Sequence, residues 1–281
     1  MSEPSAPLLR VSVVVIGDEI LGGFVQDTNS GWIAQRLTAL GIPLDRVVTV
    51  PDSFEAVDEA LAAELSRARP RVVVTSGGIG STPDDITLEA VARHLGDKLV
   101  ADPAIDARIT QALEWTARQG VTVSEGHGRS LRRMARVPSR AHLLPGADGV
   151  APGVAVDVDG GSLADGGATI VVLPGVPGEL RRIMTEGVEP ALLAGRGEPL
   201  TVVEITHGYP ESTLNPVLNR IVEEYPDVHL GSYPAAVCVI RLKGAADRVE
   251  AAAELVRAFL AELHRDQGAI RVRERWRRRW E

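Results

Sequence analysis

A glycine-rich stretch at residues 75–87 combines residue types that could hold a phosphate group. Gly77, Gly78 and Gly80 follow a β-branched run and precede a helical pattern, so we expect them between a strand and a helix. Glycines let a turn expose successive backbone N–H groups, and a helix start adds positive potential, which together form an anion site. The stretch matches neither the Walker A nor the dinucleotide-binding pattern. It therefore predicts a phosphate-binding loop, with an ordinary tight turn as the alternative.

Two adjacent carboxylates, Asp84 and Asp85, stand where the helix after this loop is expected to begin. One interpretation is helix capping, because an aspartate at a helix start accepts backbone N–H groups that have no partner within the helix. The other is a site for a hard cation, because paired carboxylates beside phosphate bind such ions. The two interpretations are compatible. We assign Asp84 to a metal and leave Asp85 open between the two roles.

A second polar segment, residues 17–23, leaves the first predicted strand at its carboxyl end and carries Asp18 and Glu19. Open α/β sheets bind ligands at this edge, so we expect the segment to meet the glycine-rich loop. These carboxylates would repel a phosphate unless a cation or a neutral ring lay between them. The sequence therefore indicates a bridging metal or hydrogen bonds to a nitrogen-rich heterocycle, with solvated turn carboxylates as the alternative.

The composition excludes several other classes of protein. The 281 residues contain 38 Asp and Glu against 30 Lys and Arg, a net charge of −8 that argues against nucleic-acid binding. No signal peptide or membrane-length apolar run is apparent, so we expect a cytoplasmic protein with no membrane partner. The single cysteine, Cys238, has no intrachain partner, and the six histidines lack the spacing of zinc ligands.

The elements that must position these residues follow an α/β pattern. Short β-branched runs alternate with stretches of helical period, which is typical of an α/β domain with a largely parallel sheet. Residues 120–150 are expected to form a long irregular connection. Strands are predicted at residues 10–16, 47–50 and 72–75, with a hairpin of residues 154–158 and 168–173. Helices are predicted ahead of Gly41, at residues 54–69, up to Gly96, at residues 103–118 and up to residue 193.

A break at residues 194–199 divides the chain. We predict a larger α/β domain at residues 1–197 and a small βαββα domain at residues 198–266. Residues 267–281 form a basic tail rich in Arg and Trp, in which the last eleven residues hold six Arg and two Glu. Such a tail is typical of a solvated terminal extension, with contact to an anionic partner as the alternative.

Several motifs in this order resemble the molybdopterin-binding domain family, whose members include MoaB-like and Mog-like proteins. The motifs lie at residues 16–21, 27–30, 75–87, 151–153, 173–179 and 231–234. Their spacing is most similar to the N-terminal region of competence-damage (CinA) proteins and to the related domain of eukaryotic FAD synthases. The similarity covers about residues 10–265. It implies a three-layer α/β/α domain with a mostly parallel sheet, joined to the small βαββα domain.

The resemblance also implies roles for individual residues. Asp84 and Asp85 would hold a divalent metal (Mg²⁺, Mn²⁺ or Co²⁺) or orient a water molecule. Ser81 stands where many relatives have proline, which would loosen the loop and keep its N–H donors. The remaining residues, with Ser81, would bind phosphate or complete the pocket: Gly77, Gly78, Gly80, Thr82, Asp18, Glu19, Thr28, Asn29, Pro174 and Gly175.

The resemblance implies two functions of different classes. The first is a metal-dependent pyrophosphatase, a hydrolase that acts on ADP-ribose-like nucleotides. The second is a non-hydrolytic protein of molybdenum cofactor biosynthesis that binds molybdopterin or a nucleotide. A vestigial pocket on a scaffold is a third possibility. Related folds form dimers and trimers, so we expect a homo-oligomer whose partner is a small-molecule nucleotide or pterin. Deamidation of nicotinamide nucleotides is not expected, because the sequence contains no deamidase domain.

Overall fold

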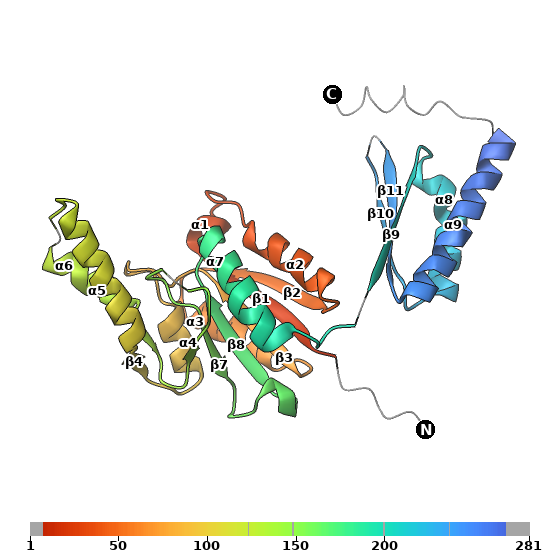
Figure 1. The fold of residues 1–281 in the computed structure, drawn as a ribbon. Helices are drawn as coiled ribbons and strands as arrows, with labels where there is room; N and C mark the ends of the chain where they lie inside the picture. Colours follow the sequence, from red (N-terminus) through yellow and green to blue (C-terminus); the bar gives the residue numbers. More distant parts are fainter. Residues whose placement is uncertain (1–7, 123, 148, 199, 236, 268–281) are drawn as a thin grey trace. The chain divides into compact units, whose positions relative to one another are not determined.

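The computed structural model describes residues 8–267 except residues 123, 148, 199 and 236 (Figure 1). The chain folds as two units, Met1–Glu198 and Pro199–Glu281. Of the Arg/Trp tail predicted at residues 267–281, all but Gln267 lies outside the described residues. None of the helices in the described ranges is both long enough and apolar enough to cross a membrane.

The first unit contains a sheet with the strand order β2-β1-β3-β8-β7-β6 (Figure 1). Neighbouring strands are parallel from β2 to β8: β2 (Leu44–Val50), β1 (Arg10–Ile16), β3 (Arg71–Ser76) and β8 (Ala168–Leu173). Antiparallel pairing adds β7 (Val154–Asp157) and β6 (His142–Leu143). The pairing of β7 with β8 confirms the predicted hairpin, and the sheet is mostly parallel as predicted.

Strand β1 shows why this sheet has layers on both faces. Val13 and Val15 pack into the core on one face, whereas Val14 and Ile16 pack into the core on the other. All four are almost fully buried. A strand that is apolar on both faces requires helices on both sides, because apolar surface is stabilised by removal from water. The three-layer α/β/α arrangement follows.

Helices from different parts of the chain supply the two outer layers. The core on the Val14 face is completed by α3 (Phe54–Leu65), α4 (Thr87–His94) and α5 (Pro103–Arg118). The core on the Val13 face is completed by α2 (Asn29–Ala39), α7 (Pro177–Ile183) and the π-helical segment Met184–Leu193.

Residues 120–150 are more regular than predicted. They contain helix α6 (Glu125–Arg133), strand β6, and strand β5 (Arg136–Pro138), which pairs antiparallel with β4 (Leu99–Ala101). The Ser124 hydroxyl caps α6 by accepting the backbone N–H of His127 at 3.1 Å. The prediction of an irregular connection was wrong. Helix α6 was not detected because it contains two glycines, which lower helix propensity, and because only one of its residues is buried, so its sequence has little apolar periodicity.

At the edge of the sheet where β1 and β3 begin, buried polar and ionic groups connect four elements, β1, β2, β3 and α3. The Arg71 guanidinium donates to Asp45 Oδ2 at 2.7 Å and to the Ser12 hydroxyl at 2.6 Å. Ser12 in turn donates to Glu64 at 2.6 Å. Burial opposes ionisation of Asp45, but hydrogen bonds from Arg71 and Arg10 hold its pKa below the ordinary value. Because Arg71 is fully buried, it depends on these partners.

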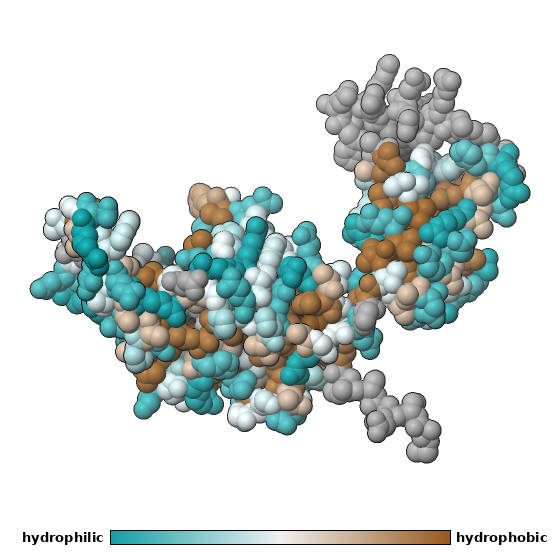
Figure 2. All heavy atoms as spheres, in the orientation of Figure 1, coloured by the Kyte–Doolittle hydropathy of each residue, from teal (hydrophilic) through white to brown (hydrophobic). Residues whose placement is uncertain are grey.

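The second unit has the predicted βαββα order. Its sheet, β10-β11-β9, is antiparallel, and a separate apolar core lies between the sheet and the helices. Figure 2 shows hydrophobic surface over this unit. Val202 in β9, Tyr233 in β10 and Val237, just before β11, are each more than 40% exposed. The elements are β9 (Thr201–His207), α8 (Glu211–Glu224), β10 (His229–Tyr233), β11 (Cys238–Gly244) and α9 (Ala246–Gln267).

Candidate functional site

A cavity of about 130 Å³ lies at the carboxyl edge of the parallel strands. The ends of β1 and β3 form its floor, and the chain segments before α2 and before α7 form its walls. Ligand pockets commonly have volumes of about 300–1,000 Å³, so this cavity encloses only part of a nucleotide or a pterin. The lining residues are Val15, Ile16, Glu19, Ile20, Val25, Gln26, Asp27, Thr28, Asn29, Ser76, Gly77, Gly175 and Pro177.

Asn29, the first residue of α2, joins the walls of this cavity. Its side-chain amide donates to the Ser76 hydroxyl at 3.1 Å and to the Gly175 carbonyl at 2.8 Å. Its Oδ1 atom is buried without a hydrogen-bond partner, and so is the hydroxyl of Ser30. Asp27 caps α2 by accepting the backbone N–H groups of Asn29 and Ser30 at 3.0 and 3.1 Å. Thr28, at the N-cap position, makes no side-chain cap bond.

The glycine-rich loop passes close to β1, and its shape requires glycine at two positions. Gly77 has a φ of 104°, and a Cβ atom there would lie 2.2 Å from the carbonyl oxygen of Ile16. Gly78 has a φ of 64°, and its Cβ would lie 2.4 Å from Thr87 Oγ1. Thr87 begins α4 and donates its hydroxyl to the Gly77 carbonyl at 2.8 Å. The loop is therefore held between the end of β1 and the start of α4.

Some of the donors expected to bind phosphate already have partners in this structure. The N–H of Gly77 donates to the Leu173 carbonyl at 3.2 Å. Asp85 Oδ2 accepts the backbone N–H of Thr82 at 2.8 Å and its hydroxyl at 2.5 Å. Asp85 thus caps the turn, whereas α4 begins after Ile86 without a side-chain cap. Its carboxylate occupies the position that an anionic ligand of Thr82 would take.

Four carboxylates share the rim above this loop. Asp52, which follows β2, accepts the backbone N–H of Asp18 at 2.9 Å. Burial raises the pKa of Asp52, and the charges of Asp18, Glu19 and Asp84 raise it further. Asp84 itself is exposed, and the Thr82 side chain, together with the charge of Arg133, lowers its pKa. The neighbouring carboxylates therefore oppose ionisation of Asp52, and a cation beside it would relieve this repulsion.

The donor chemistry of this rim fits a hard divalent cation. Within the described ranges, however, no three His, Cys, Asp or Glu side chains gather closely enough to hold a metal by themselves. Mg²⁺ is commonly held by one or two carboxylates together with substrate phosphates. A metal at this rim would accordingly need the ligand's own oxygens as well as Asp84 or a neighbouring carboxylate.

A second, smaller cavity of about 50 Å³ lies on the other side of the glycine-rich loop. Arg133 ends α6 and Arg136 begins β5, and both line this cavity. Figure 2 shows a mostly hydrophilic surface over α5 and α6. Both arginines were missed by the sequence analysis, because they fall in the segment expected to be irregular. The other lining residues are Gly78, Ile79, Gly80, Asp85, Leu88, Glu89 and Leu99.

The predicted site residues thus separate into three groups. The larger cavity is lined by Glu19, Thr28, Asn29, Gly77 and Gly175. The smaller cavity is lined by Gly78, Gly80 and Asp85. Neither cavity is lined by Asp18, Ser81, Thr82, Asp84 or Pro174. Asp52 was also missed, although it follows a strand that ends at the same edge and was detectable on that ground.

The sheet and this edge define an α/β protein whose candidate ligand site lies at the carboxyl ends of parallel strands. Residues 12–194 match the family described as "Probable molybdopterin binding domain". The chain belongs to this family, as the sequence motifs predicted.

Curated relatives agree with this assignment. A protein of Pyrobaculum calidifontis is 35% identical over 226 residues, which cover 79% of this chain and 79% of that protein. A protein of Desulforudis audaxviator, named as a competence-damage inducible protein, is 33% identical over 76% of this chain. The match covers 48% of that longer protein. The crystal structure of CinA from Thermoplasma acidophilum is 28% identical, with a TM-score of 0.50 over 63% of this chain and 94% of that one.

Proposed function

We propose that this protein is a metal-dependent pyrophosphatase that acts on ADP-ribose-like nucleotides. The observation that carries the proposal is the acidic rim beside the glycine-rich loop, where Asp52 accepts the backbone N–H of Asp18 and where burial, together with the charges of Asp18, Glu19 and Asp84, raises the pKa of Asp52. A dinucleotide brings a diphosphate, and a diphosphate beside several carboxylates requires a cation. When bound, Mg²⁺, Mn²⁺ or Co²⁺ would polarise the diphosphate.

The residues of this chain have defined parts in the proposed reaction. The glycine-rich loop holds the diphosphate near the end of β3, and Asn29 orients the rest of the nucleotide in the larger cavity. Asp84, whose lowered pKa keeps it ionised, orients the attacking water or holds the metal. Water attacks phosphorus and the P–O–P bridge breaks, which yields two phosphate monoesters. Ligand binding at Thr82 requires Asp85 to leave its present partner.

A second candidate is supported by a different observation. The unpartnered Asn29 Oδ1 and Ser30 hydroxyl offer hydrogen bonds to a pterin or a base, and such groups are costly to leave unpaired. These atoms support binding of a pterin or a base, which is all that a non-hydrolytic molybdopterin- or nucleotide-binding protein requires. Association as a homo-oligomer and location in the cytoplasm stay predictions under both proposals.

The test is release of AMP from ADP-ribose, FAD and NAD, and of adenosine 3′,5′-bisphosphate from CoA, in the presence of Mg²⁺, Mn²⁺ or Co²⁺. Asp84→Asn is expected to abolish release and leave the protein folded, because Asp84 is fully exposed. Asp247→Asn, an equally exposed change in α9, serves as the matched control. Absence of release from every compound, with binding retained by both variants, would favour the non-hydrolytic protein.

A further inference from the structure

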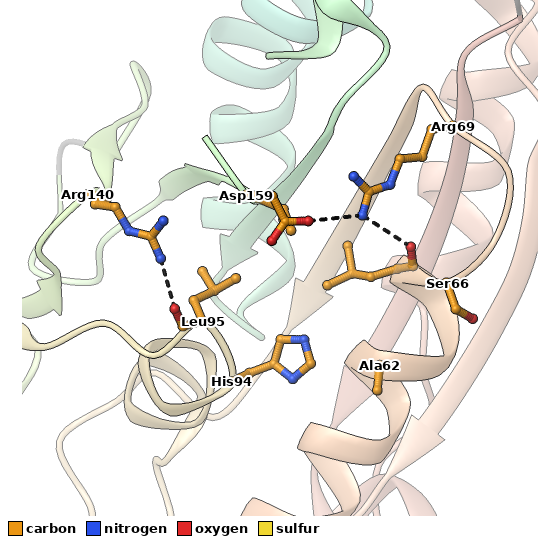
Figure 3. Close-up of a pocket in the computed structure, with 9 residues that line it drawn as sticks. Ala62, Ser66, Arg69, His94, Leu95, Arg140 and Asp159 are labelled. Atoms are coloured by element: carbon orange, nitrogen blue, oxygen red, sulfur yellow. Dashed lines mark hydrogen bonds and ion pairs between the residues drawn. The ribbon is translucent and has the colours of Figure 1, made fainter. Parts of the chain in front are cut away.

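A third cavity, of about 340 Å³, lies at the opposite edge of the sheet from the glycine-rich loop (Figure 3). It is located where β3 begins and β7 ends, beside the last turns of α3 and α4. Its volume falls within the range of about 300–1,000 Å³ that is usual for small-molecule sites. The lining residues are Ala62, Leu65, Ser66, Arg69, His94, Leu95, Arg140, Val158 and Asp159.

The charges of the lining favour an anion. Arg69 comes from the connection between α3 and β3, and Arg140 from the connection between β5 and β6. Figure 3 shows the carboxylate of Asp159 between these two arginines. His94, held by Asp58 at 2.7 Å, lies at the same cavity. The lining of the cavity therefore contains two guanidinium groups and one carboxylate, that of Asp159.

The two arginines differ in how firmly they are held. Arg140 donates to the Leu95 carbonyl at 3.0 Å, and its Nε atom lies 3.5 Å from Asp97. Arg69 Nη2 lies 3.5 Å from both the Leu65 carbonyl and Asp159 Oδ2, which is the outer limit of a hydrogen bond. A guanidinium has five N–H donors. Arg69 therefore has donors for a stronger acceptor than those it now contacts.

Asp159 lies in the turn that follows β7, with a φ of 55° in the left-handed region, which aspartate adopts more readily than most other non-glycine residues. Its side chain is 76% exposed. The turn places this carboxylate beside Arg69, where an external anion could replace it.

We propose that this cavity binds a small phosphate monoester. The phosphate group lies between Arg69 and Arg140 in place of the Asp159 carboxylate, and the organic part covers the apolar surface of Leu65 and Leu95. A phosphate dianion carries more charge and more acceptor atoms than the single carboxylate it displaces, and arginine pairs with it through parallel hydrogen bonds. The site is separate from the proposed pyrophosphatase site and does not depend on that function.

The ring signals of His94 provide a local readout, because this histidine lines the cavity. We would assign them by NMR with His94→Gln and titrate the protein with inorganic phosphate, ribose 5-phosphate, AMP and adenosine. The phosphate compounds are expected to shift the signals saturably, and adenosine is not. If the two esters bind more tightly than inorganic phosphate, the organic part of the ligand contributes to the affinity. No saturable shift below about 10 mM, or an equal shift with adenosine, would overturn the proposal.

Variants with opposite expected signs separate binding from loss of structure. Arg69→Gln and Arg140→Gln should each weaken binding about tenfold or more, because each removes charge-assisted hydrogen bonds. Asp159→Asn should strengthen binding, because it removes the competing charge, and an unfolded protein cannot give that result. Arg67→Gln, a neighbouring arginine that pairs with Glu64 outside the lining, is the control and should bind as the unaltered protein does. Equal affinity in all four variants would contradict the proposal.

Discussion

The side-chain amide of Asn29 donates a 2.8 Å hydrogen bond to the backbone carbonyl of Gly175, across 146 positions of sequence. The same amide also reaches the Ser76 hydroxyl at the end of β3. One side chain thus connects the start of α2, which follows β1, with the end of β3 and the segment after β8. Its position explains why the cavity depends on α2 beginning at this residue.

Asn29→Ala is expected to open the cavity and weaken ligand binding at least about tenfold, with a loss of about 1–3 kcal/mol in the free energy of unfolding. The loss arises because the Gly175 carbonyl is left without this donor. Calorimetric titration with ADP-ribose and urea denaturation measure the two effects. Ser30→Ala is the control for stability, since the hydroxyl it removes is buried without a partner. A stability loss as large in Ser30→Ala would contradict this account.

Gly77→Ala is expected to destabilise the protein more than Gly96→Ala. Both positions have positive φ, but a Cβ at Gly77 meets the Ile16 carbonyl, whereas nothing lies within 4 Å of a Cβ at Gly96. Gly96→Ala should therefore cost only the backbone strain of about 1–3 kcal/mol. Urea denaturation of the two variants gives the steric cost by difference, and similar values would show that β1 gives way to the methyl group.

The raised pKa of Asp52 predicts a dependence of stability on pH. Because the folded-state pKa lies above the ordinary value of 3.8, the stabilising contribution of Asp52 is fully present below 3.8. It is lost as the pH rises through the folded-state pKa. Asp52→Asn should therefore gain stability relative to the unaltered protein as the pH rises across this window.

Urea denaturation of both proteins across the acidic range checks this expectation for Asp52. Addition of Mg²⁺ at neutral pH should reduce the difference between them if the rim binds the cation, because a cation favours the ionised carboxylate. A difference that stays constant with pH would show that neither burial nor the neighbouring carboxylates raise the pKa of Asp52.

Arg71→Met is expected to lower the free energy of unfolding by about 3–5 kcal/mol, because it leaves Asp45 and Glu64 without a buried cation. Arg46→Met removes a half-exposed partner of the same Glu64, at 3.3 Å, and should cost about 0–1 kcal/mol. Thermal and urea denaturation measure both. Equal losses in the free energy of unfolding would mean that the buried Arg71 contributes no more to stability than an ordinary surface ion pair does.

Local patterns predicted much of the fold. The near-continuous apolar run within Arg10–Ile16 indicated a strand buried on both faces, and the two cores confirm it. The same reasoning failed at α6, because a helix of nine residues with two glycines and one buried residue has a weak periodic signal. Short elements that depend on tertiary packing are not detectable from their own residues.

The sequence by itself determined the α/β class, the glycine-rich loop and the family, because periodicity and motif spacing act within short stretches of chain. Only the tertiary structure decided which groups act together. Asp85 faces Thr82, Asp52 joins the acidic rim, and Arg133 approaches Asp84. The crossovers between parallel strands bring these segments to the same carboxyl edge of the sheet. Electrostatic interactions depend on the distance between charges in space and not on their separation along the chain, so the sequence alone does not reveal them.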